Sequence, residues 1–309
     1  SLIDAIKSQQ TGKKLMQHAL TVDVDDYFQV SAFANQIDMK DWPNWPLRVE
    51  QNTHALLELF EKKNVSATFF VLGWVAERCP ELIRAIHKAG HEVASHGMTH
   101  QLVYNQKPEV FREETFRSKK LIEDIIGEAV YGYRAASYSV TPRSLWALET
   151  LIDAGFTYDS SIFPVHHDRY GMPGAPLNIH TAQTNNGKTL TEFPLTSAKF
   201  FNGRLPVAGG GYFRIYPYFF SKLMLKRAAA EIKQPFIFYL HPWEIDPEQP
   251  RVPNSSALSR FRHYTNLSRC LPRLENLIGD FDFTSVKDVI DTYQSSHELE
   301  IFDYLTLAN

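Results

Sequence analysis

Two histidines four residues apart, His96 and His100, are the residues of this chain whose type and spacing most clearly suggest chemistry. They lie in the stretch Ser95-His96-Gly97-Met98-Thr99-His100, where a short apolar-leaning run passes into a helix or a tight loop. On one helical turn, imidazoles at this spacing face the same way and can bind one metal ion. A zinc-protease motif is excluded, because it needs Glu beside the first His and Gly97 stands there. The pair predicts a metal site that takes a carboxylate from elsewhere, and ordinary half-buried histidines are the alternative.

Carboxylates and other polar residues follow further apolar runs. Asp25 and Asp26 come after the alternating run 19–24, and Arg134, Asp159 and His241 each come directly after an apolar segment. The carboxyl ends of the strands share one face in a (β/α) barrel, where active sites are built. Singly, an Asp pair is also typical of a turn, an Arg of a structural ion pair, and a His of a packed loop. Their joint placement predicts one active site.

Strand and helix alternate along the chain and would position these residues. Apolar patterning predicts strands over residues 19–24, 67–72, 91–95, 130–133, 156–158, 190–193, 235–240 and 281–284. Helices are expected over residues 49–64, 80–89, 109–126, 142–154, 218–233, 267–278 and 286–293. The alternation favours an α/β fold built as a (β/α) barrel. A doubly wound open sheet is the alternative, but it would need a glycine fingerprint after the first strand.

Composition narrows the class of protein. The chain has 309 residues, 44% of them hydrophobic, and a formal net charge of −3 without a basic stripe, so nucleic acid is not an expected partner. Cys79 and Cys270 are too few for a disulfide framework. No run is long enough for a membrane span and no leader pattern is visible, so we expect a cytoplasmic protein that reaches a membrane only through a biosynthetic complex. The expected organisation is an arm at 1–18, one domain at 19–296 with an extension from about 246, and a tail at 297–309.

These segments together resemble the polysaccharide deacetylases with a NodB homology domain. The resemblance covers about residues 19–245 and rests on an ordered set of segments: 21–26, 95–100, 134–138, Asp159 and 240–241. The segments 160–171, 209–214 and 261–267 look like the subgroup found with bacterial exopolysaccharide and exosortase gene clusters. The resemblance implies a distorted (β/α) barrel whose substrate is an N-acetylated polysaccharide or oligosaccharide.

The resemblance also implies a divalent metal, most often zinc, with cobalt, nickel or manganese as alternatives. Carried over by position, Asp26, His96 and His100 would be the ligands, and Asp25 the general base that takes a proton from water. Asp23 competes for either carboxylate role, because alternation along the strand places it on the same side as Asp25. Many relatives of the subgroup carry Glu at the position of Asp25.

The remaining motif residues would complete an acid–base mechanism. By resemblance, His241 would protonate the leaving amine, Asp159 would fix its tautomer, and Arg134 would orient the general base. The backbone N–H of Tyr138 would stabilise the developing oxyanion. Ala136 replaces the usual Pro of this motif, which loosens the loop that positions the N–H group.

Substrate contacts are expected from aromatic residues. Tyr138, Tyr212 and Trp243 are candidates for stacking on sugars, although lid packing is the commoner role of such residues, and the loop 42–46 is expected to border the cleft. His166 and His167 suggest either a second cluster or a network that holds a long loop, and the run 209–211 suggests close backbone approach to a glycan. Two other functions stay open: an amidase of the same fold that acts on a small non-sugar amide, and a non-catalytic glycan-binding barrel.

Overall fold

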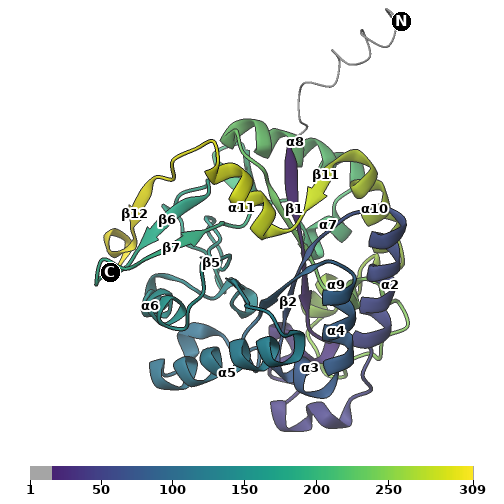
Figure 1. The fold of residues 1–309 in the computed structure, drawn as a ribbon. Helices are drawn as coiled ribbons and strands as arrows, with labels where there is room; N and C mark the ends of the chain where they lie inside the picture. Colours follow the sequence, from purple (N-terminus) through teal and green to yellow (C-terminus); the bar gives the residue numbers. More distant parts are fainter. Residues whose placement is uncertain (1–15, 309) are drawn as a thin grey trace, which may run out of the picture.

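A curved, mainly parallel sheet forms the centre of the molecule (Figure 1). The computed structural model describes residues 16–308, so most of the arm predicted at 1–18 lies outside the described residues. The strands are β1 (Gln17–Val24), β2 (Thr68–Val71), β3 (Glu92–Ser95), β4 (Gly132–Tyr133), β5 (Tyr158–Asp159), β6 (His180–Gln183), β7 (Thr189–Glu192), β8 (Ser197–Phe200), β9 (Gly203–Pro206), β10 (Ile237–Leu240), β11 (Asp282–Thr284) and β12 (Ile301–Asp303).

Strand order follows the chain along most of the sheet. The order is β10-β1-β2-β3-β4-β5-β7-β6-β12, and β11 also pairs with β1. Every pair in this sheet is parallel except β6 with β7, while β8 and β9 form a separate antiparallel pair. No strand pair between residues 16 and 308 joins β10 to β12, so the hydrogen-bonded ladder is not a closed ring. The predicted α/β fold with a distorted, barrel-like sheet is confirmed.

Helices lie around the outside of this sheet (Figure 1). They are α2 (Val49–Lys62), α3 (Gly73–Arg78), α4 (Pro80–Lys88), α5 (Pro108–Ile126), α6 (Trp146–Asp153), α7 (Gly210–Ile215), α8 (Tyr218–Ile232), α9 (Ala257–Tyr264), α10 (Leu267–Asp280) and α11 (Val286–Gln294). Both α4 and α5 begin with proline, which has no N–H to lose in a first turn. Gly127 ends α5 at φ 73°, a conformation that glycine adopts without a steric cost.

Burial explains why the central strands form where the apolar runs predict. All four residues of β2 and of β10 are buried, as expected for strands covered on both faces by the core. Strand β1 is buried over Residues 18–24 and pairs with β2, β10 and β11. Its carboxyl end, together with those of β3 and β10, therefore points to one side of the sheet.

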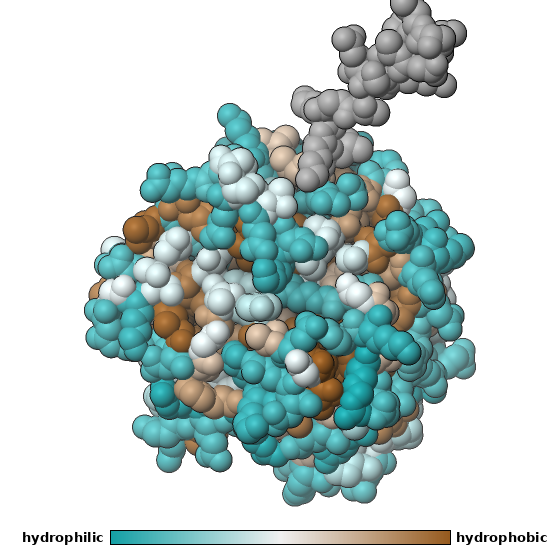
Figure 2. Space-filling model, in the orientation of Figure 1, coloured by the Kyte–Doolittle hydropathy of each residue, from teal (hydrophilic) through white to brown (hydrophobic). Residues whose placement is uncertain are grey.

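The end of the chain takes part in the sheet. The predicted tail at 297–309 contains β12, which pairs with β6, and a short 3₁₀ turn, Tyr304–Leu307, in which Tyr304 is buried. The face in Figure 2 is largely hydrophilic, with apolar side chains in separate groups. Among the described helices, none has the length and apolar character needed to cross a membrane.

Candidate active site

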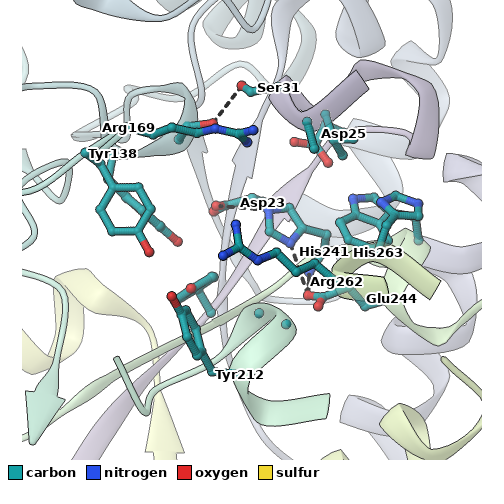
Figure 3. A pocket seen from close by; sticks show the side chains of 18 of the residues that line it. Asp23, Asp25, Ser31, Tyr138, Arg169, Tyr212, His241, Glu244, Arg262 and His263 are labelled. Carbon is teal, nitrogen blue, oxygen red and sulfur yellow. Dashed lines mark hydrogen bonds and ion pairs between the residues drawn. The ribbon is translucent and has the colours of Figure 1, made fainter. Parts of the chain in front are cut away.

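A cavity of about 280 Å³ opens at the carboxyl ends of β1, β3 and β10 (Figure 3). The first half of the chain contributes polar side chains, among them Asp23, Asp25 and His96. The second half contributes a wall that includes Tyr170, Tyr212 and residues of α9. The predicted site residues at these strand ends are therefore brought together, with the exceptions described below.

Asp25, His96 and His100 form the group best arranged to hold a metal ion. Their ligand atoms all lie within 4.8 Å of one another. Asp25 Oδ2 lies 3.1 Å from His100 Nε2 and 3.7 Å from His96 Nε2. Both oxygens of Asp25 and Nε2 of His96 are buried without a hydrogen-bond partner in the described part of the chain. Buried oxygen and nitrogen atoms without a hydrogen-bond partner suit the coordination of a divalent cation, and the combination of carboxylate and imidazole suits zinc.

A backbone contact on the side away from Asp25 fixes the orientation of the His96 ring. Its Nδ1 lies 2.8 Å from the carbonyl oxygen of Arg134, to which it donates if Nε2 carries the lone pair. That tautomer turns Nε2 toward Asp25, as a metal-ligating histidine requires. The connection from His96 to His100 is a loop and not the helical turn that its spacing suggests, because Gly97 and His100 have φ of 75° and 55°.

Asp26, the carboxylate predicted as a ligand, lies outside this group. Its Oδ1 accepts a hydrogen bond from the N–H of Tyr27 at 2.9 Å, and its Oδ2 accepts from the N–H groups of Arg48 at 2.8 Å and Val49 at 3.0 Å. It thereby caps the 3₁₀ turn η1 (Tyr27–Gln29) and fixes the start of α2. Neighbouring residues at a strand end point in opposite directions, so Asp25 and Asp26 cannot both face the histidines. The geometry favours Asp25, and not Asp26, as the carboxylate ligand.

Asp23 makes the contact with Arg134 that was expected for the general base, Asp25. Its Oδ1 accepts a hydrogen bond from Arg134 Nη1 at 2.9 Å, and its Oδ2 lies 3.8 Å from His241 Nε2. Arg134 is fully buried and also donates to Thr21 Oγ1 at 2.7 Å and to the Ser160 carbonyl oxygen at 3.0 Å. Arg134 therefore orients Asp23 and not Asp25, the base that the sequence predicts, which lies two residues further along the chain.

His241 is held by a buried carboxylate that the sequence reading missed. Its Nδ1 lies 3.1 Å from Glu244 Oε2, and Arg214 Nε donates to Glu244 Oε1 at 2.8 Å. The side chains of Arg214 and Glu244 are each 1% exposed, so this ion pair is shielded from solvent. Together with His241 the two side chains form a chain of charges, Arg214–Glu244–His241, that ends at the pocket. A glutamate three residues after His241, behind Pro242, is the capping-box signal that could have identified it.

Asp159, expected as the partner of His241, makes other contacts. It accepts hydrogen bonds from the N–H of Ser161 at 3.0 Å and from its hydroxyl at 2.6 Å, and it lies opposite Glu192 in the pairing of β5 with β7. Burial raises the pKa of Asp159 and raises that of Glu192 well above its ordinary value. Asp159 is thus part of a buried pair of carboxyl groups beneath the site, because β5 pairs with β7 and places Asp159 opposite Glu192.

The acid–base groups have opposed pKa shifts. Burial lowers the pKa of His241, but the negative charges of Asp25 and Glu244 outweigh it and raise that pKa to about 9. Burial raises the pKa of Glu244, but Arg214 and His241 outweigh it and hold that pKa at about 2. His241 is therefore protonated at neutral pH and can act as an acid.

The segment around Tyr138 is strained. Ser137 and Tyr138 have φ of 50° and 51° inside the 3₁₀ turn η5 (Ala136–Tyr138), where non-glycine residues are uncommon. The N–H of Tyr138 donates to the Ala135 carbonyl oxygen at 3.2 Å, so it is not free as the expected oxyanion donor. Its side chain lines the pocket, and its phenol oxygen is buried without a partner in residues 16–308.

The other predicted contact residues are divided between the pocket and the core. Tyr212 and Trp243 line the pocket, and the Trp243 ring stacks on His263 with centroids 4.0 Å apart. Trp42 is not part of the lining and packs edge-on against Trp74, with centroids 5.5 Å apart, so the loop 42–46 does not border the pocket as expected.

Two segments with open roles also lie near the pocket. His167 lines it, while His166 is exposed and outside it, so the pair is not a second metal cluster. Gly210 and Gly211 line the pocket. Gly209 has φ 135°, and a Cβ there would lie 1.9 Å from the Tyr239 carbonyl oxygen, so close packing on β10 requires glycine.

Comparisons with known proteins match two families along the chain. The model described as polysaccharide deacetylase matches residues 39–158, and the one described as a domain of unknown function (DUF3473) matches residues 160–291. The match to the polysaccharide deacetylase family covers less than half of the chain. Most of the pocket wall from the second half of the chain falls in the DUF3473 segment, which begins well before the extension predicted from about 246.

Curated relatives match this chain over part of their length. A peptidoglycan deacetylase from Helicobacter pylori is 34% identical over 113 residues, 37% of each chain. A chitooligosaccharide deacetylase from Bradyrhizobium is 32% identical over 95 residues, 31% of this chain and 43% of that protein. The matched segment thus spans less than half the length of either relative.

Solved structures share the fold of this chain over most of its length. A Mycobacterium smegmatis protein, provisionally assigned as a polysaccharide deacetylase, is 20% identical with a TM-score of 0.58 over 90% of this chain and 89% of that one. An allantoinase is 15% identical with a TM-score of 0.60 over 93% of each chain. At these identities the likeness concerns the fold alone.

Proposed function

We propose that this protein is a metal-dependent hydrolase that removes N-acetyl groups from amino sugars of a bacterial polysaccharide and releases acetate. The observation that carries the proposal is the placement of a metal-type triad, Asp25, His96 and His100, beside a carboxylate and an imidazole, Asp23 and His241. The match to the polysaccharide deacetylase family over residues 39–158 and the names of the curated relatives agree with this reaction and with a sugar substrate.

The metal would be held by Asp25, His96 and His100, with zinc as the proposed ion. When bound, a divalent ion supplies Lewis acidity toward the amide carbonyl and the attacking water. Asp23, oriented by Arg134, accepts the proton of that water. His241 donates a proton to the departing nitrogen, so that a free amine and acetate result.

The wall from the second half of the chain would bind the glycan. Tyr138, Tyr212 and Trp243 offer aromatic surface in the pocket, which suits the apolar faces of sugar rings. The segments 160–171, 209–214 and 261–267 supply much of this wall, and these are the segments that resemble the exopolysaccharide-associated subgroup. An exopolysaccharide precursor is therefore the proposed substrate. The cytoplasmic location stays a prediction, which fractionation of host cells tests.

A second candidate is an amidase that acts on a small non-sugar amide. The metal-type triad and the acid–base pair would hydrolyse such an amide by the same chemistry. A non-catalytic glycan-binding role is disfavoured, because binding alone needs neither the oriented Asp23 nor the charged chain behind His241.

Acetate release distinguishes these functions. We expect release from N-acetylglucosamine oligomers, its loss on chelation and its return with zinc. Small acetylated amines and cyclic imides run in parallel test the amidase. Turnover of those compounds with none of the oligomers would overturn the deacetylase proposal.

A further inference from the structure

The charges that line the pocket do not balance one another. The three lining carboxylates, Asp23, Asp25 and Glu244, each face a cationic or metal-binding partner. Arg134 pairs with Asp23, and Asp25 lies among the histidines of the metal-type triad. Arg214, itself a lining residue, is occupied by Glu244 at 2.8 Å.

Two arginines remain after these pairs are counted. Arg169 and Arg262 both line the pocket and are exposed, and neither forms an ion pair with any residue from 16 to 308. Figure 3 shows both side chains reaching into the pocket. Both also act on His167, whose pKa is lowered first by burial and then by the positive charges of Arg262 and Arg169.

The backbone of Arg169 is fixed although its side chain is free. Its N–H donates to His167 Nδ1 at 3.1 Å, and its carbonyl oxygen accepts from the Tyr104 hydroxyl at 2.8 Å. The next residue, Tyr170, stacks on His167 with ring centroids 3.8 Å apart. Because the backbone of Arg169 is fixed, less conformational entropy is lost when its guanidinium binds a ligand.

Arg262 is presented in a similar way from α9. Its carbonyl oxygen accepts from Arg214 Nη2 at 2.8 Å, so the chain of charges behind His241 also anchors this helix. The neighbouring His263 is buried and stacks on Trp243. Arg262 is thus carried by a helix that is linked through Arg214 to Glu244, the partner of His241.

We propose that Arg169 and Arg262 bind an anionic group of the substrate, a carboxylate or a phosphate next to the sugar that carries the acetamide. Two guanidinium forks offer the planar donors that such oxyanions accept in pairs. The inference rests on the proposed function for the acetamide sugar, while the anion site stands on the charge balance alone. The substrate class is accordingly an acidic glycan or a phosphate-linked sugar.

Binding of matched ligand pairs tests the anion site. The first pair is an oligosaccharide in which N-acetylglucosamine alternates with glucuronic acid, and the same compound with its carboxyl groups reduced to alcohols. The second pair is N-acetylglucosamine 1-phosphate and its methyl glycoside. Affinities are measured by calorimetry on metal-loaded protein that carries Asp23→Asn to prevent turnover.

We expect the acidic member of one pair to bind about tenfold more tightly than its neutral partner, a difference that shrinks with added salt. Arg169→Gln and Arg262→Gln should each remove most of it, whereas Arg227→Gln, an exposed arginine of α8 outside the pocket, should keep it. The pair that shows the preference identifies the anion as carboxylate or phosphate.

Equal affinity within both pairs, or a preference that survives both arginine substitutions, would overturn the anion site. The outcome is separate from that of the acetate assay. An anion preference without acetate release would sink the deacetylase proposal and leave the anion site standing, and acetate release without a preference would do the reverse.

Discussion

At the scale of single residues, the site depends on which of three nearby aspartates faces which partner. Asp23 and Asp25 point into the pocket and Asp26 points away, as the alternation of an extended chain requires. The sequence motif identified the segment and both histidines, and it assigned Asp26 as the ligand and Asp25 as the base, whereas our proposal uses Asp25 and Asp23. Motif spacing alone could not decide this, because three carboxylates lie within four positions.

Asp26 is expected to act on stability and not on metal binding. Asp26→Asn replaces one acceptor oxygen by an amide that faces backbone N–H groups, so the free energy of unfolding should fall by about 1–3 kcal/mol. The zinc content of the purified protein should stay at that of the wild type. Denaturant titration and metal analysis measure both; loss of zinc at unchanged stability would restore Asp26 as a ligand.

Glu244 is expected to set the basic limb of the pH profile. His241 must be protonated to act as an acid, so activity falls as pH rises through its pKa, which Glu244 raises. Glu244→Gln removes that negative charge, and the basic limb of kcat should move to lower pH by roughly one unit. Glu248→Gln, an exposed neighbour, serves as the control. An unmoved limb would show that Glu244 does not act through His241.

At the scale of elements, the regular alternation was predictable and the loops that carry the site were not. Strands β1, β2, β3 and β10 fall where apolar runs predict them, because they are buried on both faces. The loop from His96 to His100 and the turn at Tyr138 depend on positive φ, which spacing does not reveal. Elements α7 and α9 were missed because each is short, with only six and eight residues. Arg214 and Arg262, which they carry, went unassigned as a result.

The buried carboxyl pair below β5 and β7 is expected to make stability fall as pH rises. The pKa of Glu192 is well above its unfolded value, so its stabilising contribution is complete below the unfolded pKa and is lost as pH rises through the folded one. Glu192→Gln can keep the bond from the Ile162 N–H and donate to Asp159. The variant should therefore lose less stability than the wild type between pH 5 and pH 8. Parallel pH dependences of the free energy of unfolding would contradict this.

At the scale of the whole molecule, the two family segments share one sheet. Strand β1 pairs with β2 from the first segment and with β10 and β11 from the second. The pocket likewise takes its metal-type triad from the start of the chain and its glycan wall from the rest. The family boundary near residue 159 is therefore not a boundary between independent folds.

Unfolding should consequently be a single transition. We expect one calorimetric peak whose van't Hoff and calorimetric enthalpies agree, and no cooperative transition for a fragment that ends at residue 159. In that fragment β1 would lose its pairing with β10 and β11. Two resolved peaks, or a cooperatively folded fragment, would show that the segments fold separately.

The most direct test of the central claim compares Asp23→Asn with Asp25→Asn in one assay. Acetate release from N-acetylglucosamine oligomers and zinc content are measured on the same samples. The account predicts that Asp25→Asn loses both zinc and activity, whereas Asp23→Asn keeps its zinc and loses activity by about 10²-fold or more. If Asp23→Asn instead lost zinc, or if Asp25→Asn kept it, the assignment of ligand and base would be contradicted.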